Sequence, residues 1–180
     1  SRYINGCSGY SERDFVEAPS QVYQSWAWEY EVLKRFAVHH ESGEVIPEEL
    51  VQRMRQADVF GRGMRVYRRL FYSKFALAIH QLDSHEPDIA ALYKSLHQTH
   101  SPWPYEKGDH RYAGFLYVVG YGAAFYTYLW SDVIARDIIS KFKAAGFADQ
   151  TTALRFRKSI LEPGGTVDAK LHNDDFHADM

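Results

Sequence analysis

The sequence predicts an all-α protein, and we expect a helical bundle. Apolar residues recur at steps of three and four in several stretches, strand-like alternation is scarce, and glycines and prolines separate these stretches. With 180 residues, of which 46% are hydrophobic and 24% charged, the chain is long enough for a domain with a sizeable core. We therefore expect one helical domain over residues 1–165 and a frayed polar tail over 166–180.

The helix boundaries follow from apolar periodicity and from the residues that interrupt it. An apolar stripe indicates a first helix over about 11–40. Pro19 predicts a kink or a helix start within this range, because proline lacks the backbone donor and crowds the preceding turn. Pro47 favours the start of a helix that ends near Val59. Further helices are expected over about 64–82, 87–96, 121–145 and 150–161, with a loop over 100–114.

Charge and cysteine content exclude several classes of protein. The net charge is −2, from 21 basic and 23 acidic residues, and it supports neither a nucleic-acid partner nor an anionic membrane surface. No apolar run approaches the roughly 20 residues that a membrane span needs. The single cysteine, Cys7, excludes an internal disulfide framework and a cysteine-rich metal site. We expect an intracellular protein, cytoplasmic or mitochondrial.

Two carboxylates near the start of the chain are candidates for metal chemistry. Asp14, Glu17 and Gln21 are spaced at i, i+3 and i+7, which places them on one face of a helix. Acids spaced in this way can present one oxygen to a metal and one acceptor to a neighbouring histidine. From spacing alone, the more ordinary interpretation is a solvated helix face with capping acids.

The stretch from Ser11 to Gln21 reads Ser-Glu-Arg-Asp-Phe-Val-Glu-Ala-Pro-Ser-Gln. It resembles the third-ligand helix of the thimet oligopeptidase and neurolysin family of zinc metallo-oligopeptidases. In that family, two histidines and a general-base glutamate come from an HExxH helix, and a glutamate on the next helix is the third zinc ligand. The resemblance implies that Glu17 is that zinc ligand. From helix geometry we infer that Asp14 accepts a hydrogen bond from a zinc-bound histidine.

Later segments, over 28–50, 120–130 and 155–165, carry the same resemblance through most of the chain. Residues 120–130, Gly-Tyr-Gly-Ala-Ala-Phe-Tyr-Thr-Tyr-Leu-Trp, are similar to a glycine-rich loop whose tyrosines face the substrate cleft in that family. The resemblance implies that Tyr121 and Tyr128 are catalytic residues. A core position for both aromatic rings is the ordinary alternative.

The chain also departs from the family pattern. It contains no HExxH motif, and only sixteen residues precede Glu17. Leu116 stands where the family has a substrate-contacting histidine, Val119 replaces a loop glycine, and Phe125 replaces a tyrosine that assists the tetrahedral intermediate. Leucine and phenylalanine side chains cannot donate hydrogen bonds to a developing oxyanion.

Two interpretations of function stay open at this point. The first is the C-terminal portion of a zinc-dependent metallo-oligopeptidase that hydrolyses short peptides. This truncated portion would be inactive and unable to hold zinc unless a second chain completes the fold. The alternative is a degenerate pseudoenzyme that serves as a structural or interaction subunit of a larger assembly. The residues at 116, 119 and 125 favour this alternative, because truncation alone would not replace them.

Other polar residues have more ordinary interpretations. His97 and His100 are spaced at i, i+3 and could chelate a metal, but their place near a helix end favours contacts with terminal carbonyls. Asp132 and Arg136, four residues apart, predict a surface ion pair.

Overall fold

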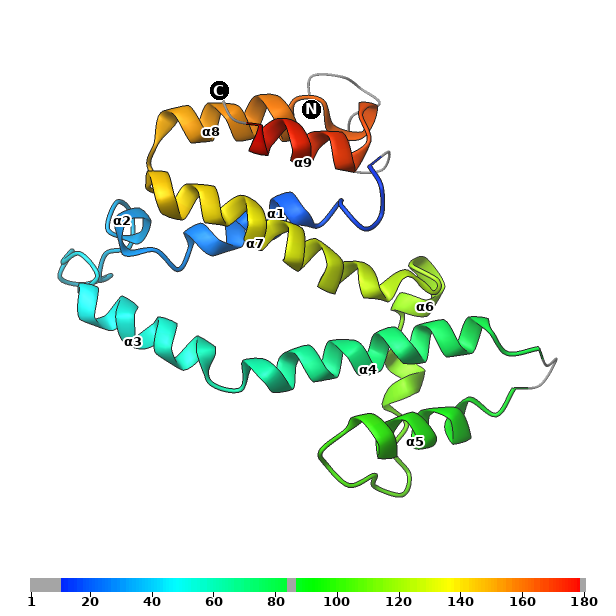
Figure 1. Ribbon diagram of the computed structural model, residues 1–180. Helices are drawn as coiled ribbons and strands as arrows, with labels where there is room; N and C mark the ends of the chain where they lie inside the picture. The colour runs from blue at the N-terminus through cyan, green and yellow to red at the C-terminus, as the bar shows by residue number, and fades with distance from the viewer. Residues whose placement is uncertain (1–10, 84–86, 179–180) are drawn as a thin grey trace. The chain divides into compact units, whose positions relative to one another are not determined.

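The computed structural model describes residues 11–83 and 87–178, and this part of the chain is all-α, as predicted (Figure 1). The α-helices are α1 Ala18–Trp26, α2 Tyr30–Leu33, α3 Glu48–Val59, α4 Arg62–His80, α5 Ile89–His100, α6 Tyr117–Gly120, α7 Thr127–Ala145, α8 Gln150–Phe156 and α9 Ala169–His177. Shorter turns are η3 Arg111–Gly114, η4 Ala124–Tyr126, the π-turn η5 Arg157–Leu161 and η6 Gly164–Thr166. Within these residues one isolated antiparallel bridge joins Val38 to Val45, without a sheet. Cys7 lies outside the described residues.

Contacts divide the chain into two compact units, each of which has its own core. The first unit is Ser1–Phe60 together with Trp130–Met180, and the second is Gly61–Leu129. None of the described helices combines the length and the apolar character that crossing a membrane requires. The proposed division into a domain over 1–165 and a tail over 166–180 stays a prediction.

The core of the first unit is assembled around α7, against which the N-terminal segment, α8 and α9 pack (Figure 1). Its rings meet edge to face, with centroids 5.1 Å apart for Trp26 and Phe142 and 5.8 Å apart for Phe142 and Phe156. Its buried residues are Phe15, Ala18, Val22, Ala135, Ile138, Ile139, Phe142, Phe156, Ile160 and Phe176. Phe15 and Ala18 flank Glu17, so this core fixes the backbone on both sides of the candidate ligand.

The core of the second unit lies between α4 and α5, which run antiparallel (Figure 1). Phe71 and Phe75, one helical turn apart on α4, both pack edge to face on the ring of Tyr93 from α5. Phe115 closes the same cluster from the segment before α6. This core supports the aromatic stretch that leads from α6 into α7.

The expected first helix over 11–40 is wrong as a single element. Residues 13–17 form turns, α1 covers Ala18–Trp26, and α2 follows after an extended Glu29 (φ −104°, ψ 126°). The helix start predicted near Pro19 is confirmed, because the proline lies in the first turn of α1, where its missing N–H costs nothing. The apolar period of the sequence therefore serves two short helices instead of one long helix.

The long aromatic helix expected from residue 121 begins six residues later, at Thr127. Residues 117–126 instead form the short helix α6 and the turn η4, separated by Gly122 with φ +58°. A left-handed residue cannot continue a right-handed helix, and glycine adopts this conformation at the lowest cost. The predicted loop over 100–114 is correct except for the short turn η3 at its end.

The expectation that the last fifteen residues are frayed is wrong for α9. His172 and Phe176, four residues apart, are both buried. Phe176 packs in the core, while His172 lies between two main-chain carbonyls, with Nδ1 2.6 Å from Ser159 O and Nε2 2.8 Å from Gly164 O. A polar-looking segment is thus held by one apolar ring and one doubly hydrogen-bonded imidazole.

Candidate functional site

Glu17 lies at the junction between an irregular turn and α1, where it is the N-cap residue. Its side chain is half-buried, between the buried Phe15 and Ala18. The Ser20 hydroxyl donates to Glu17 O at 2.8 Å and also contacts Glu17 Oε2 at 3.3 Å. The carboxylate is therefore attached to a well-packed backbone, and it keeps access to solvent.

Asp14 is held chiefly through its main chain. The Ser131 hydroxyl on α7 donates to Asp14 O at 2.8 Å, across 117 residues of sequence. Residues 13–17 form turns, so the common helical face expected for Asp14 and Glu17 is replaced by a shared turn. The hydrogen bond from the Asp14 carboxylate to a metal-bound histidine stays a prediction.

The metal-binding capacity of the described residues is limited. They include no group of three or more His, Cys, Asp or Glu side chains that could hold a metal ion. Zinc in proteins normally takes four ligands, of which three come from the protein even in catalytic sites. Glu17 fits the role of one oxygen ligand, and the described chain does not bring further ligands to it.

The two predicted tyrosines lie together in the second unit. The rings of Tyr121, at the end of α6, and Tyr128, in the first turn of α7, have centroids 5.6 Å apart. Tyr117 completes the group at 5.7 Å from Tyr121 and 5.8 Å from Tyr128. Sequence reasoning missed Tyr117, although its spacing of four residues from Tyr121 was an available signal. Glu17 and Asp14 belong to the first unit.

The departures from the family pattern have distinct surroundings. Leu116 is 74% exposed and Val119 is 85% exposed, so neither apolar side chain is accounted for by a place in the core. Phe125 packs among rings instead, 4.9 Å from Tyr117 and 5.5 Å from Tyr128 between centroids. A position where the family has a hydroxyl is thus occupied here by an apolar ring within the tyrosine group.

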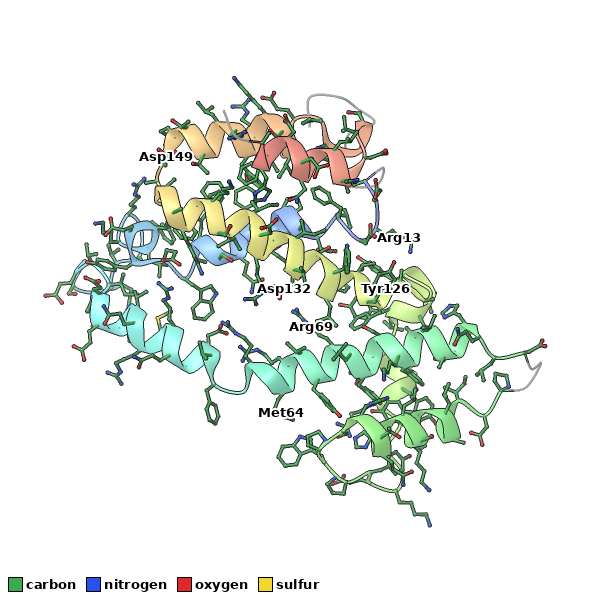
Figure 2. All side chains as sticks on the ribbon, in the orientation of Figure 1. Arg13, Met64, Arg69, Tyr126, Asp132 and Asp149 are labelled. Carbon is green, nitrogen blue, oxygen red and sulfur yellow. The ribbon has the colours of Figure 1, made fainter. Side chains whose placement is uncertain are left out.

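An apolar groove lies next to this group, between α4 and η4. Its volume is about 330 Å³, and it is lined by Leu70, Ser73, Lys74, Leu77, Ala123, Ala124 and Tyr126. Tyr126 is labelled in Figure 2. The tyrosines at 121 and 128 do not line this groove, and the groove presents almost no polar atoms to a ligand.

The strongest electrostatic interaction among the described residues is the pair formed by Asp109 and Arg111. Arg111 Nη2 and Nε donate to the carboxylate at 2.6 and 2.9 Å, and the Asp109 side chain is only 6% exposed. These hydrogen bonds lower the pKa of Asp109 to about 2. Burial, followed by the neighbouring Tyr72, raises the pKa of the nearby Tyr93 hydroxyl above its ordinary value. The pair closes the loop before η3 and contacts no predicted site residue.

The remaining polar predictions have clear outcomes. The ion pair is confirmed, because Arg136 Nε lies 2.9 Å from Asp132 Oδ2 on α7 (Figure 2). His97 is buried among aromatic rings, and the structure gives its Nδ1 no hydrogen-bond partner among the described residues. His100 Nε2 instead lies 3.1 Å from Lys74 Nζ. The two histidines therefore make separate contacts in place of a shared chelate.

Comparison with known proteins assigns the chain to a family. The model of Peptidase family M3 matches residues 2–180, nearly the whole sequence. The chain belongs to this family of metallopeptidases, as the resemblance predicted.

Individual relatives agree with this assignment. The chain is similar to mitochondrial intermediate peptidase of Arabidopsis thaliana, with 31% identity over 159 residues, 86% of this chain and 22% of the relative. Oligopeptidase A of Escherichia coli (strain K12) is 32% identical over 171 residues, 91% of this chain and 24% of the relative. Dipeptidyl carboxypeptidase of the same organism is 32% identical over 172 residues, 93% of this chain and 25% of the relative. The chain thus spans a quarter or less of the length of these relatives.

Proposed function

We propose that this chain is the C-terminal portion of a zinc-dependent metallo-oligopeptidase that hydrolyses short peptides. On its own it is not competent, because the HExxH helix that supplies two ligands and the base lies outside it. The observation that carries the proposal is the place of Glu17. Its carboxylate is half-buried on a backbone anchored by the core on both sides, within the sequence Asp-Phe-Val-Glu-Ala-Pro-Ser-Gln.

Each candidate residue has one role in this proposal. Glu17 provides one oxygen ligand, and Asp14 accepts a hydrogen bond that orients a histidine ligand. Tyr121 and Tyr128 donate from their hydroxyls to the peptide substrate. When bound, zinc supplies a Lewis acid and lowers the pKa of a water molecule. A second polypeptide must supply the remaining ligands and the base, and the family suggests an intracellular location, cytoplasmic or mitochondrial.

A degenerate, non-catalytic module is the second candidate function. The observation that favours it is the exposure of Leu116 and Val119, since neither side chain is accounted for by packing within the described structure. Exposed apolar side chains in place of a polar contact and a glycine suit a protein interface better than a peptidase cleft. In this case the chain is a structural or interaction subunit of a larger assembly.

Reconstitution with the missing part of a relative tests the proposed function. The full chain is combined with the portion of E. coli oligopeptidase A that lies outside the matched segment, which supplies the HExxH helix. We expect the purified complex to hold about one zinc ion, as a single three-ligand site requires, and to cleave a short quenched-fluorescent peptide. The chain alone should do neither.

The decisive variant of this experiment is Glu17→Gln, which removes the charged ligand at constant size. It should abolish stoichiometric zinc in the complex. Glu31→Gln is the matched control, because Glu31 is 65% exposed and pairs with Lys34 on the surface of α2. A complex that keeps its zinc after the substitution at Glu17 would exclude the assigned ligand. A wild-type complex with zinc and no cleavage would favour the degenerate module.

A further inference from the structure

We propose that Ser131 is a positioning residue, which sets the place of the Glu17 carboxylate by holding the turn that carries it. Ser131 lies on α7 with no exposed surface, and its hydroxyl donates to Asp14 O at 2.8 Å. The inference rests on the proposed function, because it takes Glu17 as the ligand to be positioned.

The need for this hydrogen bond originates at Pro19. In a continuous helix, Phe15 O would accept from the amide of residue 19, and Asp14 O would accept from the amide of Ala18. Proline has no amide hydrogen, and Ala18 N instead donates to Phe15 O at 2.8 Å. Asp14 O therefore has no helical donor. A half-buried carbonyl without a partner is unfavourable, and the distant serine hydroxyl supplies the missing donor.

The contact acts on Glu17 through a short, otherwise rigid backbone. The side chains of Phe15 and Ala18 are fixed in the core, and the Ser131 bond adds the third attachment point at Asp14. Glu17 is the third residue after Asp14 and the only one of these positions whose charged group must meet an external ligand. Productive metal geometry tolerates displacements of roughly 0.5 Å, so a turn that moves by more than this presents the carboxylate poorly.

Two features separate this role from general stabilisation. Ser131 is bound to a main-chain atom of the ligand-bearing turn, whereas Ser140, on the same helix, is exposed and donates to Asp137 O within that helix. Phe15 and Ala18 keep their core contacts when the hydroxyl of Ser131 is removed. Ser131→Ala should therefore loosen the turn and leave the fold in place, and Ser140→Ala is the matched control.

Hydrogen exchange in the full chain is the first measurement. In Ser131→Ala, the amides of Val16 and Ala18 should exchange about tenfold faster, as loss of one buried hydrogen bond implies. Amides in the middle of α4 and Ser140→Ala should stay at wild-type rates. Ser131→Thr, which keeps the hydroxyl, should restore slow exchange. Unchanged rates at Val16 and Ala18, or a uniform increase along the chain, would overturn the proposal.

Metal binding in the reconstituted complex is the second measurement. Ser131→Ala should weaken zinc binding about tenfold and alter the visible absorption of the cobalt-substituted complex. It should lower kcat more than it raises KM. Zinc affinity no weaker than in Ser140→Ala would contradict the positioning role. If the wild-type complex holds no zinc, the proposed function fails, and the exchange rates alone decide whether Ser131 holds the turn.

Discussion

At the scale of single residues, the interactions that matter most join a short-range sequence signal to a partner far along the chain. Glu17 was identifiable because its neighbours form a contiguous motif. Ser131 was not, because nothing in the residues around it indicates that its hydroxyl meets a carbonyl 117 residues away. Asp109 and Arg111 are two residues apart, and a spacing of two in a loop carries no geometric expectation. The identity of the ligand was thus predictable and its support was not.

The pair formed by Asp109 and Arg111 predicts a defined pH dependence of stability. Asp109 has a pKa of about 2 in the folded chain, below the roughly 3.9 of an unfolded aspartate. Its contribution is therefore fully present above about pH 4, and it is lost as the pH falls from about 4 to 2. Asp109→Asn should lower the free energy of unfolding at pH 7 by about 1–2 kcal/mol, since Arg111 is largely exposed and solvent weakens the pair.

Urea unfolding at a series of pH values checks this prediction. The difference between wild type and Asp109→Asn should shrink below pH 4. Asp132→Asn, which breaks an ordinary surface pair on α7, should change stability by less than about 0.5 kcal/mol. A difference for Asp109 that is constant down to pH 2 would show that the carboxylate is not the group that titrates.

At the scale of elements, the sequence signals for where helices start and stop were stronger than those for how far they extend. Pro19 and Pro47 marked helix starts correctly, and Asp149 begins α8 by accepting from Thr152 N, which lowers the pKa of its carboxyl (Figure 2). Apolar periodicity passed through Glu29 without interruption, although the backbone there is extended. Periodicity reports which face is apolar, and it does not report whether the helix is continuous.

Helix α9 shows why a polar composition misled the reading of the last residues. Of its nine residues, only His172 and Phe176 are buried. Two anchors per nine residues give too weak a periodic signal to distinguish a docked helix from a frayed tail. Docking depends on partners elsewhere, since Glu12 Oε1 also accepts from Ala169 N at the start of the helix.

We predict that His172 is the main polar anchor of α9. The imidazole faces two carbonyls, and the ring of Phe15 stacks on it at 5.4 Å. His172→Phe keeps the ring and leaves both carbonyls without their donor. It should lower the free energy of unfolding by about 2–4 kcal/mol and make α9 sensitive to proteolysis.

A thermal unfolding series with limited trypsin digestion tests this prediction. Lys170 on α9 provides the cleavage site. His40→Phe is the control, because the His40 side chain is 81% exposed and its substitution should leave both measurements unchanged. Resistance to trypsin equal to wild type in His172→Phe would mean that Phe176 alone holds the helix.

At the scale of the whole molecule, the all-α class followed from patterns that act within one helix, whereas the division into two compact units did not. Phe75 and Phe142 have the same apolar character in sequence, yet each is the centre of a different core. Which buried face meets which is decided by contacts between distant segments, and no single-helix period records that choice. Residues 1–60 and 130–180 form one unit although 69 residues separate them.

The last prediction distinguishes an active portion from a degenerate module. Phe125 lies within the tyrosine group at the position of a family tyrosine, so Phe125→Tyr restores a hydroxyl in the expected place. One oxyanion donor is worth about 10²–10³ in kcat, and partial alignment reduces the expected gain to about tenfold or more. In the reconstituted complex, kcat for the fluorescent peptide should rise while zinc content stays constant. Phe36→Tyr adds a hydroxyl to a ring that is 65% exposed, and it should leave kcat unchanged. A gain in kcat would mean that the tyrosine group faces the reacting peptide. An unchanged kcat in a zinc-loaded complex would assign these rings to the core, and the chain to the degenerate class.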